Sequence, residues 1–288
     1  VERETLDALL PLLVENQQGR QWMFGAGMAA AADDPSGTWD KLVEAFESIP
    51  DDKRNIQILR GFLNGVHGRD RELFERLMDA TISNKSLVMW VPVLQLSSEL
   101  DDGGCSRLLR SMDDPAVPAW VFQYLGHGRA TEALSDEALS RLLERLARKP
   151  DGLEVAIDVL SMHIFDNPSP IGPELARLAR ELLGQFSPSR NSRNLDFALR
   201  KLIQKFLCGP EGELHARLLL RKIHRGLDDY SLSPYDIDDA VAALFETQPI
   251  AALDELVGDE SDDGAHYARR RELRADHAKN ALSGVPLD

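Results

Sequence analysis

Apolar residues recur along most of the chain at the i, i+3 and i+4 spacing that places them on one face of a helix. The segments 39–45, 74–80 and 139–145 show this spacing, with charged residues between the apolar ones. No stretch of the sequence has the pattern that is typical of a β-strand. The pattern therefore predicts an all-α protein without a β-sheet.

The helical segments also repeat along the sequence. Four apolar segments that begin at Ile58, Val91, Phe122 and Val159 lie 33, 31 and 37 residues apart. A period of this size is typical of stacked helix hairpins, because a single hairpin cannot bury its own apolar face. We therefore expect a right-handed superhelical solenoid of about seven antiparallel helix pairs over residues 1–257.

Capping and helix-breaking residues separate the expected helices. Asp101, Ser135 and Asp151 stand at helix starts, where their side chains can accept hydrogen bonds from exposed N–H groups. A last helix near 250–257 is followed by a separate segment, 258–288, with an acidic loop and a charged helix near 265–281. The expected pairs are 3–17 with 20–33, 38–48 with 52–66, 70–83 with 86–98, 102–112 with 116–126, 136–148 with 152–165, 171–186 with 191–207, and 212–225 with 235–247.

Cysteine usage and hydropathy indicate the compartment. Cys105 and Cys208 lie far apart, on separate expected helices, so a disulfide framework is not expected and a reducing cytoplasm is the natural location. No apolar run reaches the roughly 18 residues that suggest a membrane span. We therefore expect a cytoplasmic protein that does not interact with a membrane.

The charge is strongly negative but unevenly distributed. A net charge of −15 opposes non-specific binding to nucleic acid, which depends on neutralising phosphates. The segment 190–225, however, carries nine Lys or Arg against three acidic residues. This segment is either a solvated face paired with acidic neighbours or a docking patch for an anionic partner. The candidate anion-binding residues are Arg193, Lys201, Lys205, Arg217, Arg221 and Arg225.

Two motifs resemble ligand sites but lack the context that their chemistry needs. The segment 25–30 matches the form G-x-G-x-x-A of dinucleotide binders, yet it lies inside a helical pattern and not between a strand and a helix. It is better interpreted as a small-residue helix with a close neighbour. The segment 259–264 resembles the start of a calcium loop, but position 12 would be Arg270 instead of Glu. No cofactor is therefore expected.

The seven histidines show no spacing that is typical of a metal site. His67 and His127 each precede Gly-Arg at an expected helix end, where a cation complements the helix dipole and Gly supplies a left-handed cap. We therefore expect capping roles for both and predict neither a metal ion nor a catalytic residue.

Aromatic and polar residues on the second helices suggest a recognition surface. Tryptophan, tyrosine and arginine are the usual anchors of protein interfaces. The alternative is that the rings fill the core between repeats. The candidate partner-binding residues are Arg60, Asn64, Trp90, Trp120, Tyr124 and Arg129.

Helix pairs such as Trp39–Val66 and Ser135–Ile164 resemble those of HEAT- or armadillo-like α-solenoids, over most of residues 3–257. More loosely, Lys53–Phe62 and Gly128–Thr131 are similar to the helical C-terminal arms of large bacterial multidomain ATPases, some linked to phage defence. The second resemblance implies an arm that senses a trigger or holds a partner while another domain performs hydrolysis. The start at Val1, inside an apolar helical pattern, likewise predicts a fragment of a longer protein.

These observations predict a non-catalytic scaffold that binds a protein partner, as the recognition or sensor arm of a larger protein. The alternative is a HEAT-like solenoid that binds nucleic acid through residues 190–225. Catalysis, if the parent protein performs any, is expected in other domains. The oligomeric state stays open.

Overall fold

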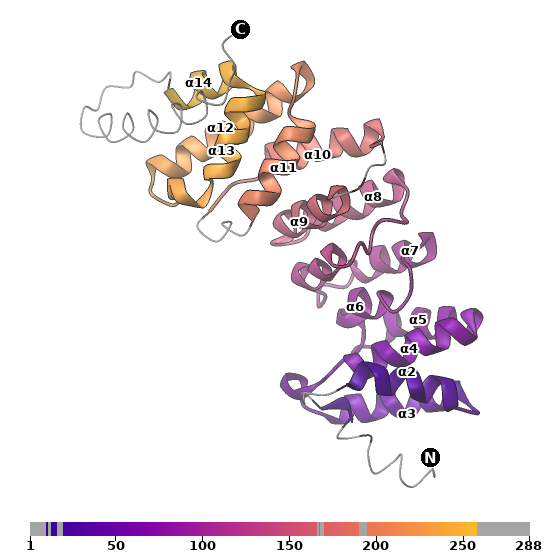
Figure 1. Ribbon diagram of the computed structural model, residues 1–288. Coiled ribbons are helices and arrows are strands. Elements are labelled where there is room, and N and C mark those ends of the chain that lie inside the picture. The colour runs from indigo at the N-terminus through magenta and orange to yellow at the C-terminus, as the bar shows by residue number, and fades with distance from the viewer. Residues whose placement is uncertain are drawn as a thin grey trace. The chain divides into compact units, whose positions relative to one another are not determined.

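The computed structural model describes residues 10, 13–15, 20–165, 167, 170–189 and 195–257 (Figure 1). In these ranges the secondary structure is helical, apart from one isolated antiparallel bridge between Glu15 and Arg54, and no β-sheet is present. The predicted all-α class is therefore confirmed. The chain divides into two compact units, Val1–Leu134 and Ser135–Asp288, which are described in turn.

In the first unit, α4 packs against α2, α3, α5 and α6, and α6 also packs against α7 and η3. The core between these helices contains Phe46, Phe62 and Phe74, which are fully buried. The elements of this unit are α2 (Gln21–Ala31), α3 (Pro35–Ser48), η1 (Asp51–Lys53), α4 (Gln57–Arg69), α5 (Arg71–Ser83), η2 (Val88–Trp90), α6 (Val91–Gln95), α7 (Asp102–Ser111) and η3 (Ala119–Gly126).

The expected second helices 86–98 and 116–126 are shorter or more tightly wound than the sequence predicts. The first range forms η2 and the short α6, and the second forms η3, a 3₁₀ helix. Pro92 lies in the first turn of α6 and has no N–H with which to continue a helix from η2. Pro118 precedes η3 and accounts for its start at Ala119, but not for its 3₁₀ winding. The expected helices 3–17 and 265–281 lie mostly or wholly outside the described residues.

In the second unit each helix packs against the next but one along the chain. One row contains α8, α10, α12 and α14, and the other contains α9, α11 and α13 (Figure 1). This arrangement is compatible with a helical repeat. The elements are α8 (Asp136–Ala147), α9 (Gly152–Ile164), α10 (Pro173–Gln185), α11 (Asp196–Phe206), α12 (Pro210–Asp228), η5 (Pro234–Asp236), α13 (Asp238–Thr247) and α14 (Pro249–Val257).

The capping predictions are confirmed in two cases and wrong in a third. The Asp101 carboxylate accepts a hydrogen bond from Gly104 N at 2.9 Å, and Ser135 Oγ accepts one from Ala138 N at 3.2 Å. Asp151 makes no side-chain cap hydrogen bond. It adopts a left-handed φ of 57° in the sharp turn between α8 and α9.

Glycines let the backbones of α2 and α4 touch. A Cβ atom on Gly25 would overlap Ile58 O, and one on Gly61 would overlap Trp22 O. Gly65 similarly faces Ala26 and Ala29. The interpretation of residues 25–30 as a small-residue helix with a close neighbour is therefore confirmed.

Side chains in the first unit donate to carbonyl groups at the ends of neighbouring helices. Arg69 donates to Ala29 O at 3.1 Å and to Ala32 O at 2.8 Å, where α2 ends. Arg54 donates to Glu47 O at 3.1 Å and Ile49 O at 2.8 Å, where α3 ends. The last carbonyls of a helix have no donor within it, so these bonds replace water where helices pack together.

The second unit uses the same device. Lys222 Nζ on α12 donates to the carbonyls of Gly184, at 2.9 Å, and Gln185 at the end of α10. Gln248 Nε2 donates to Leu207 O at 2.6 Å and to Gly209 O at 2.7 Å, just after α11. Burial lowers the pKa of Lys222, with a smaller contribution from the nearby charge of Arg225.

A Gly25→Ala substitution should destabilise the chain by about 1–3 kcal/mol, because its methyl group would force the backbones of α2 and α4 apart. Gly27→Ala, on the same helix with open space at its Cβ, should be neutral or stabilise by about 0.5–1 kcal/mol. Urea unfolding of both variants measures the difference. Equal stabilities for the two variants would contradict the close approach.

Candidate functional site

The candidate site is a groove of about 580 Å³ in the first unit, where α4, the loop after α6 and the segment after η3 meet. Its volume falls within the range of about 300–1,000 Å³ that is typical of ligand sites. The groove is lined by Arg60, Leu96, Ser98, Glu99, Leu100, Tyr124, His127, Gly128, Arg129, Ala130, Glu132 and Ala133.

A tight turn forms one wall of the groove. Ala130 N donates to His127 O at 3.2 Å, and both residues between them, Gly128 and Arg129, have a φ of 62°. Positive φ at both central positions is the mark of a type I′ turn. The predicted left-handed glycine after His127 is therefore confirmed. The matching prediction for Gly68 is wrong, because α4 continues through that residue.

Arg60 brings a half-buried guanidinium to the groove. Its Nη2 donates to Leu96 O at 3.3 Å, while its Nε is buried without a hydrogen-bond partner. It forms no ion pair with any residue that the structure describes. Burial lowers the pKa of Arg60, because the charged form loses contact with water. The guanidinium therefore retains unused hydrogen-bond donors.

Tyr124 and Arg129 also line the groove. Tyr124 is half-buried against the hydrophobic core, and its ring packs edge-on against His127 at a centroid distance of 5.8 Å. Arg129 is exposed and forms an ion pair with Glu132 at 3.5 Å. With Glu99 on the lining as well, the groove contains charges of both signs around an aromatic ring.

The structure brings together three of the six candidate partner-binding residues, namely Arg60, Tyr124 and Arg129. Asn64 lies one turn further along α4 and donates to Ser97 O at 2.8 Å, so its amide holds the loop that lines the groove. The aromatic candidates Trp90 and Trp120 are not among the lining residues.

The two tryptophans have different environments. Trp90 is half-buried and packs against the core of the first unit, in agreement with the alternative that the rings fill the core. Trp120 is 46% exposed on η3. Neither position contradicts a role in partner binding, which stays a prediction for both.

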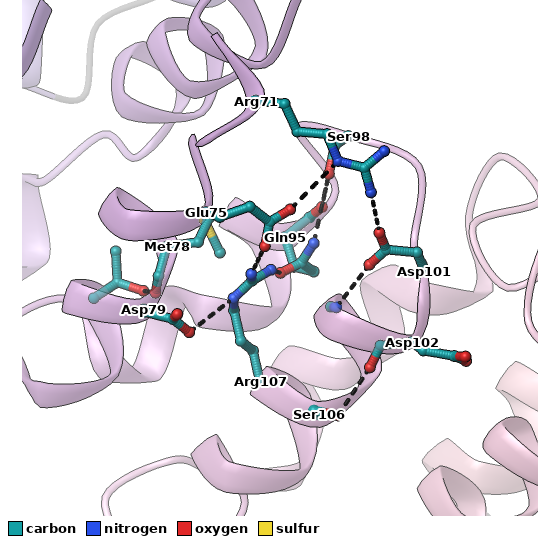
Figure 2. A network of polar contacts seen from close by, with 12 residues as sticks. Arg71, Glu75, Met78, Asp79, Gln95, Ser98, Asp101, Asp102, Ser106 and Arg107 are labelled. Atoms are coloured by element: carbon teal, nitrogen blue, oxygen red, sulfur yellow. Dashed lines mark hydrogen bonds and ion pairs between the residues drawn. The ribbon is translucent and has the colours of Figure 1, made fainter. Parts of the chain in front are cut away.

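Arg107, which the sequence did not indicate as a functional residue, lies in a polar network with side chains of α5 and α6 (Figure 2). It is only 4% exposed and forms ion pairs with Glu75 and Asp79 of α5, and it donates to Gln95 of α6 at 3.2 Å. Burial, and to a lesser extent the charge of Arg110, lowers the pKa of Arg107. This network fixes α5, α6 and α7 together and thereby anchors both ends of the loop that lines the groove.

The basic segment forms ion pairs between α12 and α14. Arg221 Nε lies 2.9 Å from a carboxylate oxygen of Glu255, and Arg217 contacts Asp254 of α14 at 3.1 Å as well as Glu213 of its own helix at 3.0 Å. The hydrogen bond from Arg221, followed by the charges of Arg221 and Arg217, lowers the pKa of Glu255 against the opposing effect of burial. This geometry favours the interpretation of a paired face over that of an anion-docking patch.

Three of the remaining basic candidates lie in the described part of the chain. Arg225 and Lys205 are exposed, and Lys201 Nζ lies 5.5 Å from the centroid of the Phe197 ring. Arg193 lies outside the described residues.

Other chemistry is sparse in the part of the chain that the structure describes. It contains no cluster of three or more His, Cys, Asp or Glu that could hold a metal ion. The calcium-like segment 259–264 lies outside it. Cys105 is buried, Cys208 is exposed, and no disulfide joins them. No helix within these ranges is long and apolar enough to cross a bilayer.

The fold and the groove define the class of protein: an all-helical chain of helices packed against one another, compatible with a helical repeat, with an open groove in its first unit. No protein-family model, curated protein or solved structure matches this chain. The support for a function is therefore the geometry of the groove and its charges.

An Arg107→Met substitution should destabilise the chain by about 1–3 kcal/mol, because it removes the buried cation that joins Glu75 and Asp79 of α5 to Gln95 of α6. Arg110→Met should cost less than about 1 kcal/mol, because Arg110 is exposed and shares Asp79 at a surface position. Urea unfolding tests both variants. Similar losses would show that the burial of Arg107 is unimportant.

Glu255 should make the free energy of unfolding depend on pH. Its pKa in the folded chain lies below the ordinary value of 4.5, so its contribution is complete above about pH 5 and is lost as pH falls through the folded pKa. Glu255→Gln should therefore lower stability at neutral pH and flatten its decline below about pH 5. Urea unfolding at several pH values measures this slope. Arg221→Gln should weaken it too, and unchanged slopes would exclude the pairing as its source.

Proposed function

We propose that the chain is a non-catalytic interaction module that binds a segment of a polypeptide in the groove lined by Arg60, Tyr124 and Arg129. In this proposal the helix pairs of both units form a HEAT- or armadillo-like right-handed superhelix. The module acts in the cytoplasm, as the recognition or sensor arm of a larger protein whose other domains carry any catalysis.

The observation that carries the proposal is the meeting of an aromatic ring, two guanidinium groups and apolar side chains in one open groove. Tyrosine and arginine are enriched among the residues that dominate binding energy at protein interfaces. The apolar side chains on the lining include Leu96 and the almost fully buried Leu100. Such a mixture suits a polypeptide, which presents apolar side chains and polar groups together.

The supporting helices favour binding without a large rearrangement. Asn64 holds the loop that follows α6, and Arg107 joins α5, α6 and α7, which flank that loop. A groove whose walls are fixed in this way loses little conformational entropy when it binds.

The nucleic-acid alternative has weaker support. Arg217 and Arg221 already contact carboxylates of α14, and a phosphate would have to displace those contacts. The net charge of −15 adds long-range repulsion. The exposed Lys205 and Arg225 are the residues on which this alternative now depends.

Random peptides of about 12 residues, selected on the immobilised chain, test the proposal. Ala133→Trp adds bulk at the rim of the groove without removing a core contact and should weaken the selected peptides at least about tenfold in fluorescence anisotropy. Ala116→Trp is the control, an equally exposed alanine of the same unit that does not line the groove.

Equal affinity for both tryptophan variants, or no selected peptide at all, would contradict binding in the groove. A single-stranded oligonucleotide is the second probe. Binding that falls steeply with salt and is lost in a Lys205→Glu, Arg225→Glu variant would favour the nucleic-acid alternative.

A further inference from the structure

We propose that the groove recognises a carboxylate, which Arg60 binds at the base of the groove and Arg129 approaches from the rim. The inference rests on the proposed function and specifies the chemistry of the polypeptide: an acidic side chain or a C-terminal carboxylate, next to an apolar side chain that packs on Tyr124.

Arg60 differs from the other half-buried or buried arginines of its unit. Arg54 contacts two carbonyl groups and Asp51, and Arg107 contacts two carboxylates and an amide. Arg60 has only the 3.3 Å bond from Nη2 to Leu96 O and no ion pair among the described residues. A guanidinium presents five N–H donors in a planar fork that fits a carboxylate through two parallel hydrogen bonds.

The environment of Arg60 makes an external anion favourable. A half-buried cation that lacks a counterion has lost part of its hydration without receiving compensation. An incoming carboxylate supplies both the charge and the acceptors, and the surrounding Leu96, Leu100 and Tyr124 limit competition from water. Recognition at this position is therefore selective for an anion, although the chain as a whole is acidic.

The backbone at Arg129 supplies an independent observation. Arg129 is the second consecutive residue with a φ of 62°, a conformation that glycine adopts readily and arginine does not. Its ion pair with Glu132 is long, at 3.5 Å, and both side chains are exposed. The strained turn thus places a weakly held guanidinium at the rim of the same groove that contains Arg60.

Glu99 and Glu132 limit where the carboxylate can lie. Glu99 is an exposed lining residue, and Glu132 is exposed and paired with Arg129. A ligand carboxylate is repelled by both and is attracted to Arg60, on α4. An extended acidic tract fits this pattern poorly, whereas one carboxylate beside an apolar residue fits it well.

Two synthetic pools of random peptides of about 12 residues distinguish the sources of the carboxylate: one pool has free C-termini and the other is amidated. Peptides retained by the full chain are identified by mass spectrometry and measured by fluorescence anisotropy. If the carboxylate belongs to a side chain, the retained peptides of both pools should share an Asp or Glu. If it is the C-terminal carboxylate, peptides should be retained from the free pool alone and should share their last residue. Conversion of the shared carboxylate to the carboxamide should weaken binding at least about tenfold.

Arg60→Met should cause the same loss of peptide affinity. Arg60→Lys should cause a smaller loss, because lysine keeps the charge but lacks the planar pair of N–H donors. Arg76→Met, at an exposed position of α5, is the control and should leave affinity unchanged. Peptides that bind regardless of their carboxylates and of Arg60→Met, yet are blocked by Ala133→Trp, would overturn this inference and leave the proposed function standing. Failure to retain any peptide would overturn both.

The stability of the ligand-free chain gives a second readout. Arg129→Gly should raise the urea midpoint, because it relieves the positive φ, and should weaken the retained peptides severalfold. Arg60→Met should lower the midpoint only slightly, because it loses the single 3.3 Å bond from Nη2 to Leu96 O. A large fall in the midpoint for Arg60→Met together with unchanged peptide affinity would assign Arg60 to the fold and overturn the inference.

Discussion

The last carbonyl groups of every helix lack a donor within that helix, and packing helices end to side removes the water that would otherwise supply one. This chain meets the constraint with side chains from elsewhere in the sequence. Arg54 and Arg69 donate to the ends of α3 and α2, and Lys222 and Gln248 donate to those of α10 and α11. The bonds from Arg69 of α4 and Lys222 of α12 also join two helices, whereas Arg54 and Gln248 lie between helices.

Whether a cation is available to a ligand therefore depends on the groups that it already contacts. Its position in a basic or acidic stretch of the sequence does not indicate this availability. Arg217 and Arg221 belong to the most basic segment, yet both are engaged by carboxylates of α14. Arg60 lies outside that segment, and it has unused donors in a groove. Local partners, and not net charge, decide which cation is available to a ligand.

The helices could be predicted because their apolar spacing matches one buried face; Leu139, Leu142, Leu143 and Leu146 of α8 are all buried. The short α6 and the 3₁₀ helix η3 were predicted poorly, because an apolar run of one or two turns does not reveal how tightly it winds. Tyr124, Arg60 and Arg129 of the groove could be proposed from the sequence because tyrosine and arginine are common at interfaces. The contacts of Arg107 with α5 and those of Arg221 with α14 could not be predicted, since the partners lie about 30 residues away along the chain.

The backbone contact between α2 and α4 constrains how this sequence can vary in length. Each residue added to a helix rotates everything beyond it by about 100°. An insertion within α2 would therefore turn Gly25 or Ala29 away from α4 and bring a larger side chain against Ile58 or Gly65. The loop between α7 and η3 is exposed at Asp113, Pro115 and Ala116, and an added residue there rotates no helix against its neighbour. Insertions and deletions that natural variation introduces should therefore accumulate in that loop and be absent from α2.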